Sequence, residues 1–359
     1  MKISIGGTTY DKFAEYNIQL IYNAIASSFS FTGLKDFIDD ILYYPDVQIF
    51  DDNDNLILTG TLLIPEFNVS EKPELTELKG YSITGVLEDC NLPLNSLQSD
   101  NLSLKQITDK LLSPFDLEYL IDPAVESDIS ASFKKTNAGP ETKIKEFLNE
   151  LAAQKNIIIS NDEYGRLVYT RLDISKLKPV AVFEEGNPGI IKMNFPIDGQ
   201  AMHSDITIVK QASGDNADAG EYTIKNPYVS RVYRPTTKVL SSGDIFDIRK
   251  AARMELANEI ATMVLTIETT KFVKPGNLIT AKSEGCKIKD YTNFFVQETT
   301  IEGNIADERY KLKCVLPDVY TDADVKSIFD GTQYVTKWQG KGKATNKRII
   351  KYNWAGGSH

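Results

Sequence analysis

The chain has 359 residues, of which 42% are hydrophobic and 25% charged, a composition typical of a soluble globular protein with about two to four domains. A net charge of −10 argues against a protein whose main task is to grip nucleic acid, since that task requires a basic face. Three cysteines without CxxC spacing argue against a disulfide framework and a structural zinc site, so we expect inert, buried thiols. No apolar run approaches the roughly 18 residues of a membrane helix and no export signal opens the chain, so we expect no membrane insertion and synthesis in the cytoplasm.

Charge is unevenly distributed along the chain. From Gly331 onward the chain has six basic residues and no acidic residue, a charge of +6. Because the whole chain carries −10, the first 330 residues carry −16. An acidic body with a basic tail, residues 321–359, indicates that the tail docks on an acidic surface, and a solvated tail is the alternative. The candidate contact residues of this tail are Lys337, Trp338, Lys343, Lys347 and Arg348.

Residues 1–97 are predicted to form a first β domain. Asp51–Asn55 is a turn-forming cluster between two apolar runs, and the alternation that follows is typical of a strand with one buried face. Pro65 interrupts this strand, which indicates a sheet edge or a bulge. A further strand is expected to run through Tyr81 and Ile83 to Leu87. Such a meander must close into a barrel or pack on a second sheet.

Residues 98–178 are predicted to form a compact α/β insertion. Ser103 and Gln106 make a capping box for a short helix that ends before Pro114. A second helix is expected from Pro140 to about Lys155, because apolar residues recur there with helical spacing. A β-hairpin turning at Asn161–Gly165 follows directly.

Strands return in residues 179–235, which complete the first lobe or the insertion, and residues 236–320 form a second β domain with the longest helix at 244–263. The last hairpin resembles the segment at 68–93, since both consist of a strand, an acidic turn, a strand and then Cys-x-Leu-Pro. We therefore predict a mainly β fold: two antiparallel barrel or sandwich lobes, with a smaller α/β insertion between them.

Motifs for catalysis or metal binding are not found. Asp51–Asn55 begins like a calcium loop, but Leu62 stands where the bidentate glutamate is required. Gly80–Gly85 is one residue too long for a nucleophile elbow, and Gly340–Lys343 lacks the spacing of a P-loop. His203 is expected to be a satisfied histidine beside a strand. We therefore predict no catalytic, cofactor-binding or metal-binding residue, no cofactor, and no enzyme.

The order of several segments resembles one family, the baseplate hub proteins (43 kDa-type tail proteins) of Mu-like contractile-tailed phages and prophages. The segments that carry the resemblance are IGGTTYDKFAEYNIQLIYNAIASSFSFTG, LKGYSITGVLEDCNLP, KIKEFLNELAAQKNIIISNDEYGRLVYTR, and the succession RKAARMELANEIA, VKPGNLITAKSE and FFVQETTIEGNIADERYKLKCVLPD. Together they extend over about residues 1–320. Thr266–Thr270 matches the family's aromatic-Gly segment poorly, and the basic tail has no counterpart.

The resemblance implies a structural protein related to the hub part of type VI secretion spike proteins. Such hubs are homotrimers whose two tube-protein-like β domains per subunit give a pseudo-sixfold ring. The ring joins the sixfold tail tube to the threefold central spike in the virion baseplate, touches other baseplate proteins, and lets DNA pass without binding it specifically. The strongly acidic body suggests a channel that repels phosphates. The tail residues named above are then candidates for contact with the spike or a neighbouring subunit.

Two alternatives remain open. The chain is also compatible with a tail-associated glycan-binding protein or hydrolase that uses paired carboxylates, because sequence does not show which carboxylates meet in space. The same hub role could serve a phage-tail-like bacteriocin or injection device.

Overall fold

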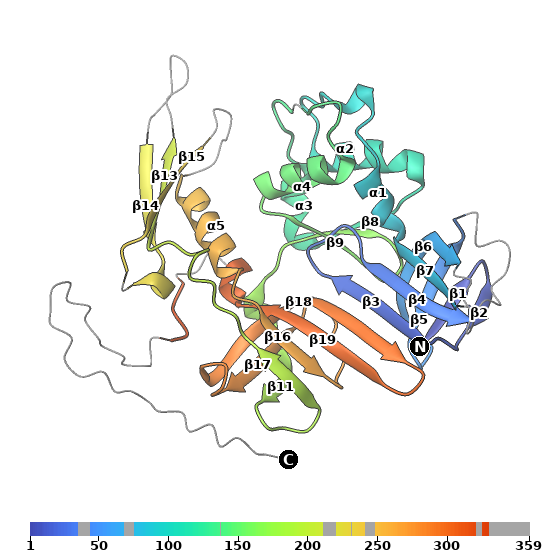
Figure 1. Cartoon of the computed structure of the whole chain (residues 1–359). Coiled ribbons are helices and arrows are strands. Elements are labelled where there is room, and N and C mark those ends of the chain that lie inside the picture. The colour runs from blue at the N-terminus through green and yellow to red at the C-terminus, as the bar shows by residue number, and fades with distance from the viewer. Residues whose placement is uncertain are drawn as a thin grey trace, which may run out of the picture.

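A computed structural model describes residues 1–34, 44–67, 75–136, 138–210, 220–230, 232–240, 248–320 and 325–329. One long sheet forms the base of the molecule, and an α/β domain and a small sheet with one helix stand on it (Figure 1). The prediction of a mainly β fold with an α+β insertion is confirmed. Within the described residues, no helix has the length and apolarity needed to cross a membrane.

The first lobe is an antiparallel sheet in the order β3-β4-β7-β6-β5-β1-β2. Its apolar face lies against β1 and β5, and together they enclose a core. The buried residues of this core include Ile3 on β1, Ile49 on β5 and Phe31 on β4. Alternation of apolar and polar residues decides which face is buried, as the sequence indicated. The strands are β1 Lys2–Ile5, β2 Thr8–Tyr10, β3 Glu15–Ile21, β4 Ser28–Leu34, β5 Asp46–Phe50, β6 Leu56–Phe67 and β7 Leu75–Ser82.

Two local predictions in this lobe are confirmed. The Asp51 carboxylate accepts backbone hydrogen bonds from Asn53 and Asn55, both 2.8 Å long, and these bonds fix the turn between β5 and β6. Pro65 lies beyond the end of β5, next to a bulge at Leu62/Ile64, so its missing N–H interrupts no ladder on that side.

The strand predicted through Leu87 ends earlier, at Ser82. The chain turns into a single 3-10 turn at Ile83–Gly85 and then into α1, Val86–Asp89. Gly85 permits this turn, because a Cβ atom there would lie 2.4 Å from the ring of Tyr81. The Thr84 hydroxyl donates to the carbonyl of Ile25 at 2.6 Å, so a side-chain bond replaces the ladder.

The α/β insertion has its own core of buried residues, among them Phe147, Leu148 and Tyr169. The capping box is confirmed, since Ser103 and Gln106 exchange both expected bonds. Two elements were not predicted: β8, which pairs in parallel with β10, and α3, which lies between the two helices that the sequence indicated. The elements are α2 Leu104–Leu112, β8 Tyr119–Ile121, α3 Glu126–Ser130, α4 Ile144–Gln154, β9 Ile158–Asn161 and β10 Leu167–Thr170.

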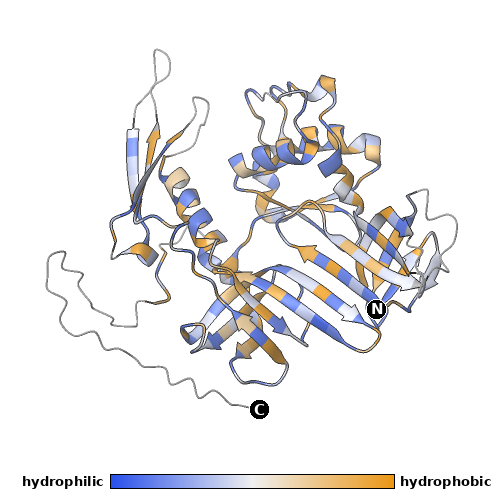
Figure 2. Ribbon diagram, in the orientation of Figure 1, coloured by the Kyte–Doolittle hydropathy of each residue, from blue (hydrophilic) through white to orange (hydrophobic). Residues whose placement is uncertain are grey.

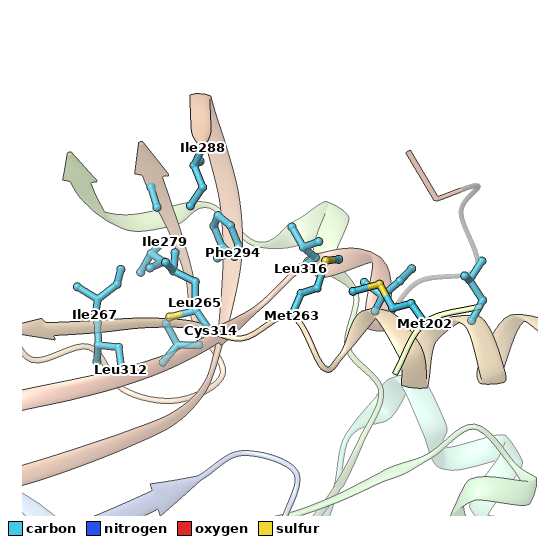
Figure 3. Packing of buried hydrophobic residues seen from close by; sticks show 14 of the residues in the cluster. Met202, Met263, Leu265, Ile267, Ile279, Ile288, Phe294, Leu312, Cys314 and Leu316 are labelled. Atoms are coloured by element: carbon cyan, nitrogen blue, oxygen red, sulfur yellow. The ribbon is translucent and has the colours of Figure 1, made fainter. Parts of the chain in front are cut away.

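The second lobe continues the long sheet and folds over its own core (Figure 3). Its buried residues include Phe294, Leu312 and Cys314, and burial raises the pKa of the Cys314 thiol, as expected for an inert core cysteine. All three cysteines are free, but Cys90 and Cys286 are only partly buried, so the prediction of buried thiols is confirmed for Cys314 alone. The strands are β11 Pro179–Glu184, β12 Ile190–Asn194, β16 Leu265–Thr269, β17 Leu278–Ser283, β18 Ile288–Asn304 and β19 Glu308–Val315.

β11 and β12 pair with strands of the second lobe, whereas the sequence led us to assign residues 179–235 to the first lobe or the insertion. β11 runs parallel to β17, and β12 is antiparallel to β16. These partners lie far apart along the chain, and local alternation carries no information on such pairing. The division of the chain at residues 97, 178, 235 and 320 stays a prediction.

A small sheet in the order β14-β13-β15 packs on helix α5. Pro227–Val229 form a 3-10 turn capped by the Asn226 side chain, and the strand that follows this turn is β15. The longest helix, predicted at 244–263, is described from Ile248 to Ile260, and residues 241–247 lie outside the described part of the chain. The elements are β13 Asp205–Lys210, β14 Gly220–Lys225, β15 Pro235–Leu240 and α5 Ile248–Ile260.

The two lobes are joined by the antiparallel pairing of β3 with β18, which we call the seam. The register runs from Ile21 opposite Glu298 to Glu15 opposite Asn304. On the apolar side Ile18 and Ile301 lie opposite each other, and both are buried. The Tyr16 ring covers Gly303, where a Cβ atom would lie 2.2 Å from it. The lobes therefore share one continuous sheet.

The seam predicts where the fold is most sensitive to mutation. Ile301→Ala removes a fully buried side chain and should lower the free energy of unfolding by about 2–4 kcal/mol. Asn17→Ala, on the opposite, exposed face of the seam, should change it by less than about 0.5 kcal/mol. Urea denaturation followed by circular dichroism measures both. Equal losses in the two variants would show that the apolar side of the seam is not what joins the lobes.

A second prediction concerns alkaline pH. Burial, together with the 2.5 Å hydrogen bond that Tyr16 donates to Glu308, raises the pKa of Tyr16 above its ordinary value of about 10. This contribution to stability is complete below pH 10 and is lost as pH rises further, because the unfolded chain then ionises first. Tyr16→Phe should therefore lose less stability between about pH 9 and pH 11 than the parent. The exposed Tyr233→Phe is the control and should behave like the parent.

Candidate functional site

The face of the long sheet opposite the two lobe cores is polar across both lobes. Residues that stand side by side on one rung, from β12 across the seam to β6, are Lys192, Glu268, Lys311, Thr300, Gln19, Ser28, Tyr81 and Thr61. Neighbouring rungs add Glu298, Lys313, Glu302, Arg309, Asn17, Lys79, Glu15, Glu77 and Glu66. Figure 2 shows the alternation of hydrophilic and hydrophobic residues along these strands. We call this surface the polar wall.

Charges on the polar wall largely cancel. Six carboxylates face five basic groups, and several form ion pairs within the wall. Lys313 lies 2.8 Å from Glu298, and Lys79 lies 2.8 Å from Glu77. Arg309 and Glu302 pair at 3.2 Å. The acidic excess of the chain therefore does not gather on this surface, and the suggestion of a strongly acidic channel stays a prediction.

One hollow of about 350 Å³ opens on the polar wall at the end of the seam. Four carboxylates line it, from Glu15, Glu77, Glu302 and Asp307, together with Arg309. Glu15 and Asp307 are exposed to solvent, and Glu302 is held by Arg309. A glycosidase acid normally sits in a shielded, apolar setting, and this hollow does not provide one.

At the far end of the second lobe, β11 is an edge strand that pairs only with β17 among the described strands. Its outward residues Val180 and Val182 are 54% and 58% exposed. Beside them Glu184 binds Lys282 at 3.0 Å and accepts a 2.8 Å bond from Tyr291. These two bonds hold the pKa of Glu184 below its usual range. An apolar strip with a charged border on a free strand edge is typical of a surface that another chain covers.

A third feature is a groove of about 490 Å³, which we call the inter-lobe groove. Its lining comes from both lobes and includes Leu20, Ile57 and Phe272. The ring of Phe272 packs against that of Tyr310 at a tilt of 57°, with the centroids 5.4 Å apart. The hairpin turn between β9 and β10 reaches this groove, where Glu163 pairs with Lys274 at 2.8 Å.

The same turn ties the insertion to both lobes. The Thr59 hydroxyl donates to the carbonyl of Glu163 at 2.8 Å on the first lobe, and Lys274 belongs to the second. Burial, the largest single effect, would raise the pKa of Glu163, but the hydrogen bond and charge of Lys274, a backbone hydrogen bond and the charge of Arg166 together hold the pKa below its usual range. Glu163 is thus ionised at neutral pH and fixes the insertion across the seam.

The predicted contact residues of the tail, Lys337, Trp338, Lys343, Lys347 and Arg348, lie outside the described residues. His203 is satisfied as expected, since its Nδ1 lies 2.7 Å from a Glu259 carboxylate oxygen. The described residues contain no group of three or more ligating side chains that could hold a metal ion. Sequence reasoning missed the β11 edge, whose only local signal was valine at alternate positions in a short strand.

Comparison with known proteins agrees with this architecture. A family model for the baseplate hub protein gp44-like, second domain, matches residues 84–171. The 43 kDa tail protein of prophage MuSo2 from Shewanella oneidensis superposes with a TM-score of 0.77 at 19% identity, covering 89% of this chain and 99% of that one. The tail protein of Neisseria meningitidis MC58 gives 0.73 at 19% identity, with 89% and 97% covered.

A more distant similarity extends to secretion systems. The E. coli c3393 protein, a component of the type VI secretion system, gives a TM-score of 0.53 at 11% identity, covering 90% of this chain and 80% of that one. No curated protein matches the sequence. The resemblance to hub proteins that the sequence indicated is confirmed: residues 84–171 match the second domain of gp44-like baseplate hub proteins, and the chain has the fold of phage tail proteins.

Proposed function

We propose that the protein is the structural hub of a contractile-tail baseplate, in a Mu-like phage or prophage or in a related bacteriocin or injection device. Three copies form a ring in which two β lobes per copy give pseudo-sixfold symmetry. The ring joins the sixfold tail tube to the threefold central spike, and its channel lets DNA pass. The observation that carries this proposal is the single sheet that runs through both lobes of one chain.

The free edges of this sheet support ring formation. A strand with one unpaired edge tends to pair with a strand of another chain. β11 has such an edge, and its residues Val180 and Val182 are exposed. The main path of the sheet ends at β12 and at β2, and β11 ends a branch through β17, so the free edges are different surfaces and we propose head-to-tail contacts between copies. Head-to-tail contacts close into a ring when the rotation between copies divides a full turn evenly.

The polar wall supports a channel that DNA crosses without being held. Nucleic-acid binding requires a track of basic groups that displaces counterions from phosphates. On the polar wall, Lys79, Lys313 and Arg309 are each paired with a carboxylate, so no such continuous track is formed. In this proposal DNA is passing cargo, and the partners are the spike, the tube protein and other baseplate proteins.

We further propose that the protein has no enzymatic activity and resides in the virion baseplate. The alternative, glycan binding or hydrolysis at the tail tip, has one observation in its favour, the four carboxylates of the hollow at Glu15 and Glu302. An assay with purified peptidoglycan distinguishes the hub from the glycan-binding protein or hydrolase. We expect that the protein neither sediments with peptidoglycan nor releases soluble fragments from it. If the parent protein did either and Glu302→Gln did not, the alternative would be established.

Assembly gives the first test of the hub. Multi-angle light scattering at micromolar concentration should return three times the mass of one chain. Val182→Asp places a charge on the apolar strip of β11 and should weaken association at least tenfold, because an unpaired charge is costly to bury in an interface. The matched control is Val239→Asp, at a valine that is 55% exposed on another sheet. A monomer at all concentrations would contradict the ring.

The basic tail gives a second test. We propose that Lys337, Trp338, Lys343, Lys347 and Arg348 contact the spike or a neighbouring subunit. Truncation after Asp330 should weaken attachment of the spike in a co-purification experiment and leave the mass of the trimer unchanged. The truncated protein with its spike attached as firmly as before would dispose of this role for the tail.

A further inference from the structure

We propose that the inter-lobe groove is the docking site of the chain's own C-terminal segment around Trp338. The proposal rests on the proposed role of the tail in subunit contact, and it names the surface that receives the tail. The groove is more apolar than two other hollows on the described residues, the one on the polar wall and one beside the β9–β10 turn, and its lining comes from both lobes.

The size and floor of the groove suit one large aromatic side chain. Its volume of about 490 Å³ lies in the range of pockets that enclose a small organic group. Leu20 and Ile57 are only partly buried, and Phe272 remains 40% exposed although its ring contacts that of Tyr310. Apolar area is therefore left uncovered there, and an indole ring would cover it while its N–H stays near polar groups.

The rim of the groove is acidic. Asp51, Asp52, Glu163 and Glu308 stand around it, against Lys274 and the amino group of Met1. A second, smaller hollow continues from the groove past the Glu163–Lys274 pair, so an extended peptide could lie along both. Such a rim favours a peptide in which lysines flank the aromatic residue.

The tail contains tryptophan with lysines nearby, and the first 330 residues contain no tryptophan. The chain contains two tryptophans, Trp338 and Trp354, and both lie in the basic segment after Gly331. Trp338 follows Lys337 directly and precedes Lys341 and Lys343. The tail begins at a fixed point, since Phe329 packs against Tyr228 with the ring centroids 5.9 Å apart.

The segment extends from Phe329. Trp338 is separated from Phe329 by nine residues, which span at most about 30 Å when extended. The proposal covers docking in the groove of the same copy and docking in that of a neighbour in the ring. Dilution distinguishes these two geometries.

The position of the two tryptophans provides the experiment. In full-length Trp354→Phe, Trp338 is the only tryptophan, so intrinsic fluorescence reports on it alone. Docking predicts emission at shorter wavelength than that of a solvated indole, and a shift to longer wavelength in 0.5 M salt, because salt screens the acidic rim. Emission of a fully solvated indole in the full-length protein would overturn the proposal.

Groove variants localise the contact. Phe272→Ala in the Trp354→Phe background should shift Trp338 emission to longer wavelength, and Asp52→Asn should do so in part, while the exposed Tyr233→Ala should have no effect. A dye-labelled peptide of residues 333–348 should bind full-length Trp338→Ala/Trp354→Phe, and Phe272→Ala should reduce its affinity about tenfold. If the peptide bound equally well to the proteins with and without Phe272→Ala, the tail would dock elsewhere. Asp52→Asn tests the same groove through charge, so the test does not depend on how well Phe272→Ala folds.

Mass measurement keeps this inference separate from the ring. Docking that survives dilution to the monomer places the segment in its own groove, and docking lost together with the trimer places it in a neighbour's; both support the groove. A stable trimer whose Trp338 is solvated would refute the docking site and leave the proposed hub intact. A monomer with a docked Trp338 would do the reverse.

Discussion

The pairing of β3 with β18 is the constraint on which the rest of the structure depends. It turns two lobes, each with an unpaired strand, into one sheet, and it does so through close packing at Ile18 and Ile301 and the contact of Tyr16 with Gly303. Once this register is set, the period of two sends most apolar residues of the strands to the lobe cores, although bulges interrupt it and Ile64 and Ile191 stay exposed. The opposite face is then mostly polar from β12 to β6.

The two faces of the sheet consequently do different work. The apolar face stabilises the lobes. The insertion is tied to both lobes through Glu163, whose carbonyl accepts a hydrogen bond from Thr59 and whose carboxylate pairs with Lys274. The polar face pairs its charges internally, so the acidic excess of the body lies elsewhere. A surface of this kind is suited to lining a passage, since it is wettable without attracting polyanions.

Apolar surface that remains exposed indicates where other chains would lie. On the described residues it includes the valines of the β11 edge and the floor of the inter-lobe groove. The β11 edge suits a rigid neighbour that continues a sheet, and the groove suits a single side chain of an extended peptide. A protein that works by shape and association requires both kinds of surface, and neither requires a reactive group.

Local sequence determined the local features: the Asp51 turn, the sheet edge at Pro65, the capping box of Ser103, the free core thiol of Cys314 and the mainly β class. Each depends on residues close together in the chain, where propensity and hydrogen bonding act directly. Tertiary structure alone decided that the strand stops at Ser82, that β11 and β12 join the second lobe, and that Glu163 meets Lys274. Such contacts bring together residues far apart in the chain, and alternation in a strand shows which face is buried but not which strand lies beside it.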